Sequence, residues 1–552
     1  MKDRLRQQIS AALHVCFDRG VLHSENIPEI QIEVPGNPDH GDFATNIAMM
    51  MARTEKKAPR QIAATLMEAL ADSPLLARVE VAGPGFINFT LAPTCWHQLL
   101  TDIMIQAEQY GHATAGQGQR VQVEFVSANP TGPLHIGHGR GAAVGDAVAA
   151  ILQAVGYDVQ REYYVNDAGN QVATLGRSIW LRLRQLNGET VVFPEDGYQG
   201  EYVRELAGFL RAEDPAVVRL DASEAITRCA NFGVRRILQW IAADLEAFGI
   251  SFDNWFSEQS LYDREMVQTE LAKLSALGLS YESEQALWLR TTDYGDDKDR
   301  VLIKSDGSPT YFASDVAYHM EKFDRGFDRV IDVWGADHHG YVPRMKAVVA
   351  GLGHSPEDLQ VLLIQMVNLL RDGQPYTMGK RSGNFISLRE VIDEVGKDAC
   401  RFFFLMRRSD SQLDFDLELA KRQSNENPVY YVQYAHARVC SINRNAAEQG
   451  ITLPQPGEVD LSPLTLSEEL ALVKQLARFP ETVLGAAQNC EPHRIVYYLQ
   501  ELAGQFHSYY NGHRVLVEDS KTTEARLFLV NCVRIVLGNA LRLLGVDAPE
   551  RM

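Results

Sequence analysis

Two histidines three positions apart stand in a glycine-rich segment, His135-Ile-Gly-His138-Gly. The apolar run at residues 121–125 before them predicts a strand, and the Pro/Gly loop at residues 129–133 ends it, because proline cannot continue a strand ladder. The small residues from 141 to 150 then predict a helix that packs closely against the strand. The first N–H groups of such a helix lack partners and lie at its positive dipole end, so the pattern predicts a phosphate-binding site.

The residue types of this segment suit a nucleotide. Gly137 and Gly139 leave room for a nucleotide to approach the backbone, and His135 and His138 can donate hydrogen bonds to phosphate oxygens. A glycine-rich turn with two surface histidines is the alternative interpretation. The preceding strand and Pro/Gly loop favour the nucleotide site.

The elements around this segment predict a parallel sheet. Residues 157–165 read as a second strand after the helix, and residues 166–171 cap a further helix. A strand–helix–strand unit implies parallel strands, whose ligands lie beyond the carboxyl ends, where Asn129 and His135 stand. No GxGxxG follows a strand here. The P-loop-like stretch at residues 373–381 is one residue too long and has Arg381 where Ser or Thr should stand.

The string from Glu124 to His138, EFVSANPTGPLHIGH, resembles the ATP-binding signature of class I aminoacyl-tRNA synthetases, and of arginyl-tRNA synthetases in particular. A second stretch, residues 377–384, resembles the KMSKS loop of that class. Thr377 stands in the place of the first lysine, and Lys380 aligns with the second. The resemblance implies that Lys380 neutralises the triphosphate as pyrophosphate leaves.

The resemblance supplies a set of expected site residues. The expected catalytic residues are His135, His138 and Lys380. The expected ATP-binding residues are Pro130, Thr131, Gly132, His135, Gly137, His138, Gly139, Met378, Lys380 and Arg381. The expected arginine-binding residues are Glu124, Asn129, Glu258, Tyr311 and Asp315. We expect no protein metal site, because Asp337-His-His is the only candidate and lacks further ligands at a recognisable spacing.

The arginine pocket follows from the chemistry of the substrate as well as from the resemblance. A guanidinium carries five donors and a permanent charge, so a selective pocket needs carboxylates held in a fork. Asn129 matches the residue that holds the substrate α-amino group, and Tyr311 with Asp315 matches the side-chain recognition motif. Glu258 matches a second guanidinium partner. The segment from Thr310 to Asp315 is expected to be a strand.

The fold class that we expect is α/β, a Rossmann-like parallel-sheet catalytic domain with an α/β domain before it and an all-α bundle after it. The expected boundaries are residues 1–110 for an N-terminal additional domain that contacts tRNA, residues 120–380 for the catalytic domain, residues 381–425 for the KMSKS-like loop and connecting stem, and residues 426–552 for the helical anticodon-binding domain. Residues 175–285 are expected to form a mostly helical insertion.

Composition limits the function classes. The formal net charge of −19 counts against nucleic-acid binding, although phosphate contacts need only local Lys and Arg. The seven cysteines are scattered without a CxxC pair, which favours a reducing, cytoplasmic compartment. No apolar run is long enough to span a membrane, and we expect a monomer without membrane contact.

The expected function is therefore an arginine–tRNA ligase that uses ATP with substrate-bound Mg²⁺ and acts on L-arginine and tRNA(Arg). Three alternatives remain at this level. One is a class I synthetase for another amino acid, of which lysine is the least firmly excluded by the acidic pocket. The others are a non-catalytic tRNA-binding paralogue and a small HxGH nucleotidyltransferase, which would not need the large helical C-terminal region.

Overall fold

The computed structural model describes residues 1–24, 26–376 and 386–552 of the chain, which form two compact units. Each unit is assembled from separate stretches of sequence. The first comprises Met1–Tyr110, Val439–Phe479 and Gly504–Val536. The second comprises Gly111–Arg438, Pro480–Ala503 and Leu537–Met552.

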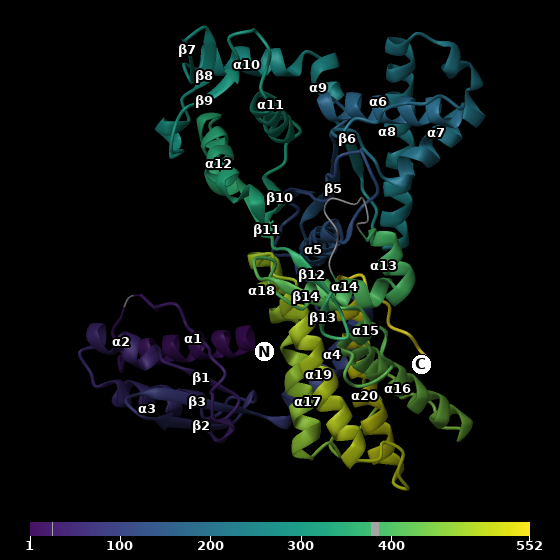
Figure 1. The fold of residues 1–552 in the computed structure, drawn as a ribbon. Coiled ribbons are helices and arrows are strands. Elements are labelled where there is room, and N and C mark those ends of the chain that lie inside the picture. Colours follow the sequence, from purple (N-terminus) through teal and green to yellow (C-terminus); the bar gives the residue numbers. More distant parts are fainter. Residues whose placement is uncertain (25, 377–385) are drawn as a thin grey trace. The chain divides into compact units, whose positions relative to one another are not determined.

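The N-terminal part of the first unit is a small antiparallel sheet with helices, drawn in purple in Figure 1. Its strands lie in the order β1-β3-β2, and β3 buries Ile87, Phe89 and Leu91 at every second position, as a half-buried strand should. The elements are α1 (Lys2–Asp18), β1 (Phe43–Thr45), α2 (Ile47–Glu55), α3 (Pro59–Leu70), β2 (Leu76–Ala82), β3 (Phe86–Leu91) and α4 (Pro93–Gln106). Strands β2 and β3 form a hairpin that turns at Gly83-Pro-Gly85.

The chain beyond residue 425 is helical, as the sequence predicts. Its helices are α16 (Pro428–Glu448), α17 (Ser467–Ala477), α18 (Phe479–Asn489), α19 (His493–Gly512) and α20 (Ser520–Leu543). Within the first unit, α17 contacts α4. The hydroxyl of Tyr110 donates to the carbonyl oxygen of Leu476 at 3.0 Å, and Lys474 forms an ion pair with Asp42.

The second unit is built on a five-stranded sheet in the order β11-β10-β4-β5-β6, with every neighbouring pair parallel. The strands are β4 (Arg120–Glu124), β5 (Asp158–Val165), β6 (Asn254–Ser257), β10 (Arg329–Gly335) and β11 (Leu359–Ile364). The chain builds outward from β4 to β5 and β6, then continues on the other side with β10 and β11. The order therefore reverses between β4 and β10. In parallel sheets, ligands bind at such a switch point, beyond the carboxyl ends of the strands.

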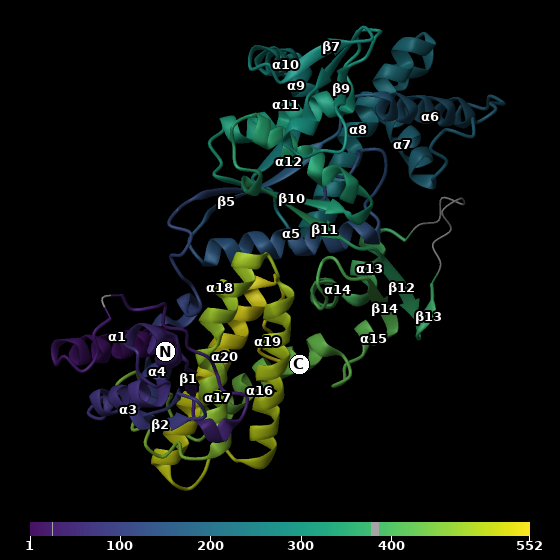
Figure 2. The ribbon, with the colours of Figure 1, turned by 90° about the vertical axis from the view of Figure 1, so that its left-hand side faces the viewer.

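Helix α5 (Ile136–Ala154) packs against this sheet (Figure 2), and most of its residues are buried. Its small residues allow the close approach that the sequence predicts. A Cβ on Gly145 would lie only 2.5 Å from the Cβ of Phe125, so no larger residue fits there. The position of α5 is thereby fixed relative to the end of β4.

Between β5 and β6 the chain forms α6 (Asn170–Leu186), α7 (Glu201–Glu213) and α8 (Ala222–Ala247). The range 175–285, predicted as a helical insertion, also contains β6, which is a strand of the main sheet. After β6 come α9 (Gln259–Asp263), α10 (Met266–Ala276) and a small antiparallel sheet of β7 (Ser280–Ser283), β8 (Ala286–Leu289) and β9 (Arg300–Ile303).

The strand expected from Thr310 to Asp315 is wrong. The segment is the start of a helix, α11 (Tyr311–Asp324), because the Thr310 hydroxyl caps the N–H of Ala313. Residues 311 and 315 therefore lie one helical turn apart. The remaining elements are α12 (Val342–Gly351), β12 (Val367–Arg371), β13 (Gln374–Pro375), α13 (Leu388–Val395), α14 (Lys397–Leu405), β14 (Leu413–Asp416) and α15 (Leu417–Lys421).

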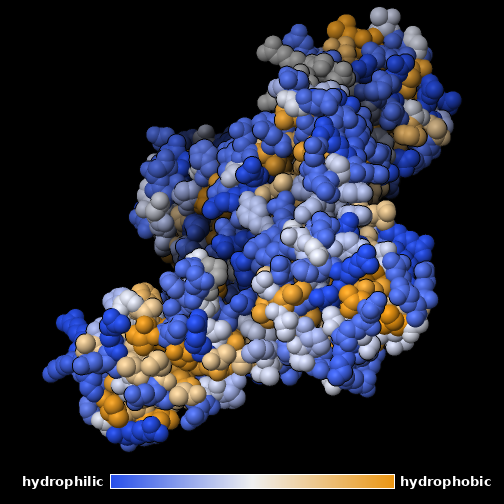
Figure 3. Space-filling view, turned by 90° about the horizontal axis from the view of Figure 1, so that it is seen from below, coloured by the Kyte–Doolittle hydropathy of each residue, from blue (hydrophilic) through white to orange (hydrophobic). Residues whose placement is uncertain are grey.

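The outer surface is mostly hydrophilic on the face seen in Figure 3, and apolar side chains gather in a few places on it. Among the described residues, no helix combines the length and the apolar character that crossing a membrane requires.

Candidate active site

His135 and His138 hold each other at the start of α5. His135 is the N-cap, and its Nδ1 accepts the N–H of Gly137 at 3.1 Å. The Nδ1 of His138 accepts the N–H of His135 at 3.2 Å, and the two rings stack with 3.8 Å between centroids. Because each Nδ1 is an acceptor, each neutral ring carries its proton on Nε2.

Both histidines are neutral near pH 7. Burial lowers the pKa of His138 to about 3, helped by the neighbouring His135, and burial also lowers the pKa of His135. Both rings line the cleft beside the sheet. They therefore offer two neutral N–H donors to a ligand there.

A strained turn carries the chain from β4 towards α5. Val126 and Ser127 have φ values of 69° and 39°, in the left-handed region that non-glycine residues avoid. The Ser127 hydroxyl donates to Glu124 Oε1 at 2.9 Å and accepts the N–H of Tyr164 at 3.1 Å. These bonds hold the turn in place, and Asn129 follows it directly.

The carboxyl ends of the strands enclose a cleft of about 1100 Å³. Asn129, the two histidines and Gly137 line one part of it, and residues after β10 and β11 line another. Residues of the latter group include Asp337, His338, His339, Gln365 and Met366, and Trp334 near the end of β10 also lines the cleft. The cleft lies where the strand order reverses, as expected for a nucleotide site on a parallel sheet.

Two carboxylates, Glu258 and Asp315, lie close enough for their charges to interact, and Asp315 lines the cleft. Burial, together with the charges of Asp315 and Asp167, raises the pKa of Glu258 to about 7. Burial likewise raises the pKa of Asp315, which accepts a hydrogen bond from the hydroxyl of Tyr341. Within the described ranges, neither carboxylate has a salt-bridge partner, so a cation bound between them would relieve their repulsion.

An amide pair connects these acids to Asn129. With its amide turned so that nitrogen faces Glu258, Asn166 donates to Oε2 at 2.7 Å, and its oxygen lies 3.2 Å from Oδ1 of the Asn129 side chain. A ligand that reaches from Asn129 to Glu258 would thus meet first an amide and then two carboxylates. That order matches the polar head and the cationic end of a basic amino acid.

Comparison with known proteins agrees with this geometry. Residues 99–404 match the family described as tRNA synthetases class I (R), catalytic domain, which covers more than half of the chain. The chain belongs to the arginyl-tRNA synthetase family. Residues 3–91 match the arginyl-tRNA synthetase N-terminal domain, and residues 432–552 match the DALR anticodon-binding domain.

Individual relatives of the synthetase family cover the whole chain. The chain is 66% identical to an arginine–tRNA ligase of Syntrophotalea carbinolica and 57% identical to one of Citrifermentans bemidjiense, over 100% of both chains in each case. The structure of the Thermus thermophilus arginyl-tRNA synthetase is similar over 100% of both chains, with a TM-score of 0.77 and 25% sequence identity.

Only some of the residues expected to bind substrates in this synthetase line the cleft. Glu124, Asn129, His135, Gly137, His138 and Asp315 line the cleft. Glu124, however, is engaged inside the protein, because Lys322 Nζ lies 2.6 Å from its Oε2. Tyr311 does not line the cleft and is 68% exposed.

Of the remaining expected residues, Glu258 and four others do not line the cleft, and three lie outside the residues that the structure describes. Pro130, Thr131 and Gly132 do not line the cleft. The carbonyl of Thr131 accepts the hydroxyl of Tyr202 in α7 at 2.8 Å. Gly139 also lies behind the cleft, where a Cβ would be 2.6 Å from Leu388. Met378, Lys380 and Arg381 lie outside the described residues.

The segment that follows the KMSKS-like loop lies against the histidine signature. The N–H of Leu388 donates to the carbonyl of Leu134 at 2.8 Å, and Ser387 forms a β-bridge with His135. Two segments that are distant in sequence are thus joined at the first turn of α5. A shift in either one would move the other.

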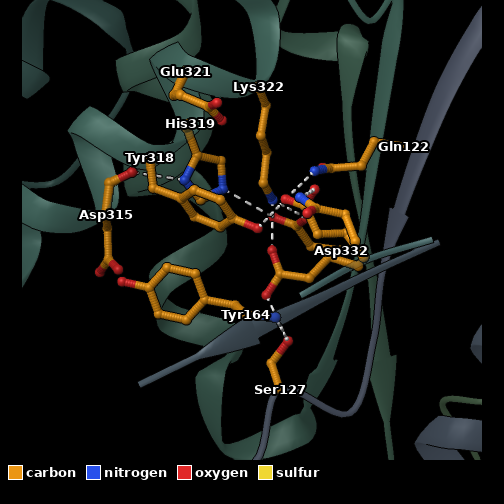
Figure 4. A network of polar contacts seen from close by, with 12 residues as sticks. Gln122, Ser127, Tyr164, Asp315, Tyr318, His319, Glu321, Lys322 and Asp332 are labelled. Atoms are coloured by element: carbon orange, nitrogen blue, oxygen red, sulfur yellow. Dashed lines mark hydrogen bonds and ion pairs between the residues drawn. The ribbon is translucent and has the colours of Figure 1, made fainter. Parts of the chain in front are cut away.

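Sequence reasoning missed a buried network beneath the cleft, shown in Figure 4. Lys322 lies with its Nζ 2.8 Å from Asp332 Oδ1, and His319 Nε2 lies 2.9 Å from Asp332 Oδ2. The two acids outweigh the effect of burial and raise the pKa of Lys322. Although burial works against them, Lys322 and His319 together lower the pKa of Asp332 to about 2.

A signal for this network was present in the sequence. Asp315, His319 and Lys322 are spaced by four and three residues, which places them on one face of a helix. Asp332 interrupts an apolar strand, and a buried acid requires a partner. The expectation of a strand at residues 310–315 hid the helical spacing.

Proposed function

We propose that Glu258 and Asp315 select the guanidinium of arginine, and that His135 and His138 stabilise the phosphates of ATP. As a member of its family the chain is an arginine–tRNA ligase. It uses ATP to convert arginine into arginyl-adenylate, with loss of pyrophosphate. It then transfers arginine to the 3′-terminal ribose of its tRNA.

The carboxylate pair carries the specificity assignment. Glu258 is 5% exposed, and its pKa is raised to about 7 by burial and by the neighbouring acids. A guanidinium bound between the two side chains would satisfy both with bidentate geometry. Citrulline has the same shape without the charge, so it would leave a buried carboxylate uncompensated and bind much less well.

The histidines carry the phosphate assignment. In the adenylation step, the arginine carboxylate attacks the α-phosphorus, and the bond to the leaving pyrophosphate breaks. Negative charge grows on the phosphate oxygens during this step. The two Nε2–H donors, held in place by the capping hydrogen bonds of α5, would stabilise that charge without a change in their own protonation. Lys380, by its alignment with KMSKS, would act on the same phosphates.

The other substrates and conditions complete the proposal. ATP enters as its Mg²⁺ complex, so that the metal comes with the substrate. We also propose that the enzyme acts as a monomer in the cytoplasm, and that tRNA must be bound before activation occurs. The N-terminal domain and the C-terminal helices would contact that tRNA.

Arginine-dependent ATP–pyrophosphate exchange, with and without bulk tRNA, tests the proposal. We expect exchange with arginine and not with lysine or citrulline, and only when tRNA is present. The Glu258→Gln variant should raise the KM for arginine at least tenfold. The difference in KM between arginine and citrulline should become smaller. Exchange with lysine at the rate seen with arginine would overturn the pocket assignment. Tight tRNA binding without any exchange would overturn the catalytic one.

A further inference from the structure

Arg401 in α14 is a fully buried residue that the reaction scheme above does not use. It is 0% exposed, although it carries a permanent charge. A buried guanidinium is costly unless its donors are satisfied. Its partners therefore show what its burial achieves.

The guanidinium joins three separate segments of the second unit. Its Nη2 donates to Asp146 Oδ2 of α5 at 2.5 Å, and its Nε donates to the carbonyl of Leu544 at 2.8 Å. Its Nη1 donates to the carbonyl of Phe248, just after α8, at 3.2 Å. One side chain thus ties the histidine-bearing helix to the end of the insertion helices and to the end of α20.

The chain end after α20 is shaped around this guanidinium. Gly545 has a φ of +65°, and a Cβ at this position would fall on the Arg401 side chain, 2.6 Å from Nε. Leu544 belongs to the segment matched by the anticodon-binding domain, whereas Asp146 and Arg401 belong to the segment matched by the catalytic domain. The contact therefore joins the two matched domains within one compact unit.

Asp146 lies in α5 and connects Arg401 to the helix that carries the two histidines. It stands two turns after His138 on the same helix, and its second oxygen accepts Arg161 Nε of β5 at 3.0 Å. An α-helix moves nearly as a rigid rod over so short a length. A shift of Asp146 along the helix axis would therefore displace the rings of His135 and His138, and a misplacement of about 1 Å can lower a rate about a hundredfold.

We propose that Arg401 is a positioning residue for adenylation. Through its ion pair with Asp146, it fixes the position of α5 relative to the end of α20. The inference rests on the proposed role of His135 and His138. Arg401 is fully buried and does not line the cleft. Its loss should therefore lower the kcat of activation and leave the KM values for ATP and arginine nearly unchanged.

A double-mutant cycle between Arg401→Lys and Gly545→Ala tests this directly. Each single variant should lower the kcat of arginine-dependent exchange, measured with tRNA present, about tenfold or more, with KM values within about threefold of wild type. Lysine lacks Nη2, the atom that the added methyl group would approach most closely, and its unbranched end can turn away from that methyl group. The double variant should therefore lose little more than Arg401→Lys alone, because the two sites act through the same contact.

Gly278→Ala is the matched control. Gly278 has a φ of +72° with nothing within 4 Å of the built Cβ, so alanine there carries the same backbone strain without a clash. It should keep the wild-type kcat. If Arg401→Lys does not fold, Gly545→Ala against Gly278→Ala still decides the matter.

The outcomes separate the two proposals. Wild-type kcat in Gly545→Ala, or losses in the double variant that multiply, would overturn the positioning role while leaving the proposed function intact. A wild-type enzyme without arginine-dependent exchange would instead overturn the proposed function itself. Melting temperatures of all variants would show whether a loss of kcat merely follows a loss of stability.

Discussion

Lys322 and Glu124 form a buried ion pair beneath the cleft, with 2.6 Å between Nζ and Oε2. The negative charge of Glu124 is thus met by a cation of the protein itself. The other oxygen of Glu124 accepts the hydroxyl of Ser127, which holds the strained turn before Asn129. We therefore expect Glu124 to act on arginine mainly through the shape of this turn, whereas Glu258 and Asp315 supply the charge.

Replacing Lys322 with methionine should be strongly destabilising. The change leaves Glu124 and Asp332 buried without their cation, which typically costs about 3–5 kcal/mol. The free energy of unfolding in urea measures the effect. Lys346→Met is the control, because its partner Glu357 is 85% exposed and such a pair contributes at most about 1 kcal/mol. Equal losses in the two variants would contradict the assigned role of Lys322.

Arginine binding should strengthen as the pH rises through about 7. The raised pKa of Glu258, about 7, means that below this pH the carboxyl is protonated in the free enzyme and must lose its proton to pair with a guanidinium. With that pKa, the apparent Kd should fall about tenfold between pH 6 and pH 8. Calorimetry in buffers of different ionisation enthalpy would detect the released proton.

The Glu258→Gln variant isolates this effect. It cannot titrate, so its weaker arginine binding should lose the tenfold dependence on pH. The raised pKa of Glu258 also makes the stability of the free enzyme depend on pH. Because the group is neutral more readily in the folded than in the unfolded state, its contribution to stability is present below about pH 4.5 and is lost as the pH rises through 7. A pH dependence of arginine binding that persists in the variant would assign it to another group.

His138 should act as a neutral donor rather than as an acid or base. Its pKa of about 3 predicts that the kcat of activation has no step near pH 6.5, the usual pKa of histidine. His138→Asn and His138→Gln should each lower kcat about 10²–10³-fold, the usual cost of losing one donor to a growing negative charge. A fall in wild-type kcat below pH 6.5 that disappears in both variants would contradict neutral donation.

The low pKa of His138 also affects stability. Between about pH 6.5 and 3 the unfolded chain binds a proton at this residue that the folded chain does not. The contribution of His138 to stability is therefore full above pH 6.5 and is lost as the pH falls through this window. His138→Gln should remove that part of the acid sensitivity.

The sequence was sufficient to predict the elements with a strong local signal. The strand–loop–helix around His135 and the parallel pairing of β4 with β5 follow from glycine, proline and apolar periodicity. Residues 310–315 misled because Tyr-Phe-Ala favours a strand locally, while the Thr310 cap that starts a helix depends on a single hydroxyl. Local propensity could not decide between the two.

The contacts between distant segments could not be predicted from one sequence. The pairing of Lys322 with Glu124 joins residues 198 positions apart, and that of Arg401 with Asp146 joins residues 255 apart. Nothing in the local sequence around either partner indicates which residue it pairs with. The exposure of Tyr311 and the occupied state of Glu124 depend on such contacts, whereas the resemblance could supply only the positions.

Gly139→Ala should lower activity even though alanine favours helices. The added Cβ would lie 2.6 Å from Leu388 Cδ1 and 3.1 Å from Phe404, so Leu388 must shift, and its N–H is bonded to Leu134 at the start of α5. We expect the kcat of arginine-dependent exchange to fall about tenfold, because the first turn of α5 holds the two histidines. Gly208→Ala in α7 is the control. Nothing lies within 4 Å of its built Cβ, so alanine should stabilise that helix by about 1 kcal/mol at unchanged kcat. Full activity in Gly139→Ala would show that α5 tolerates movement of Leu388.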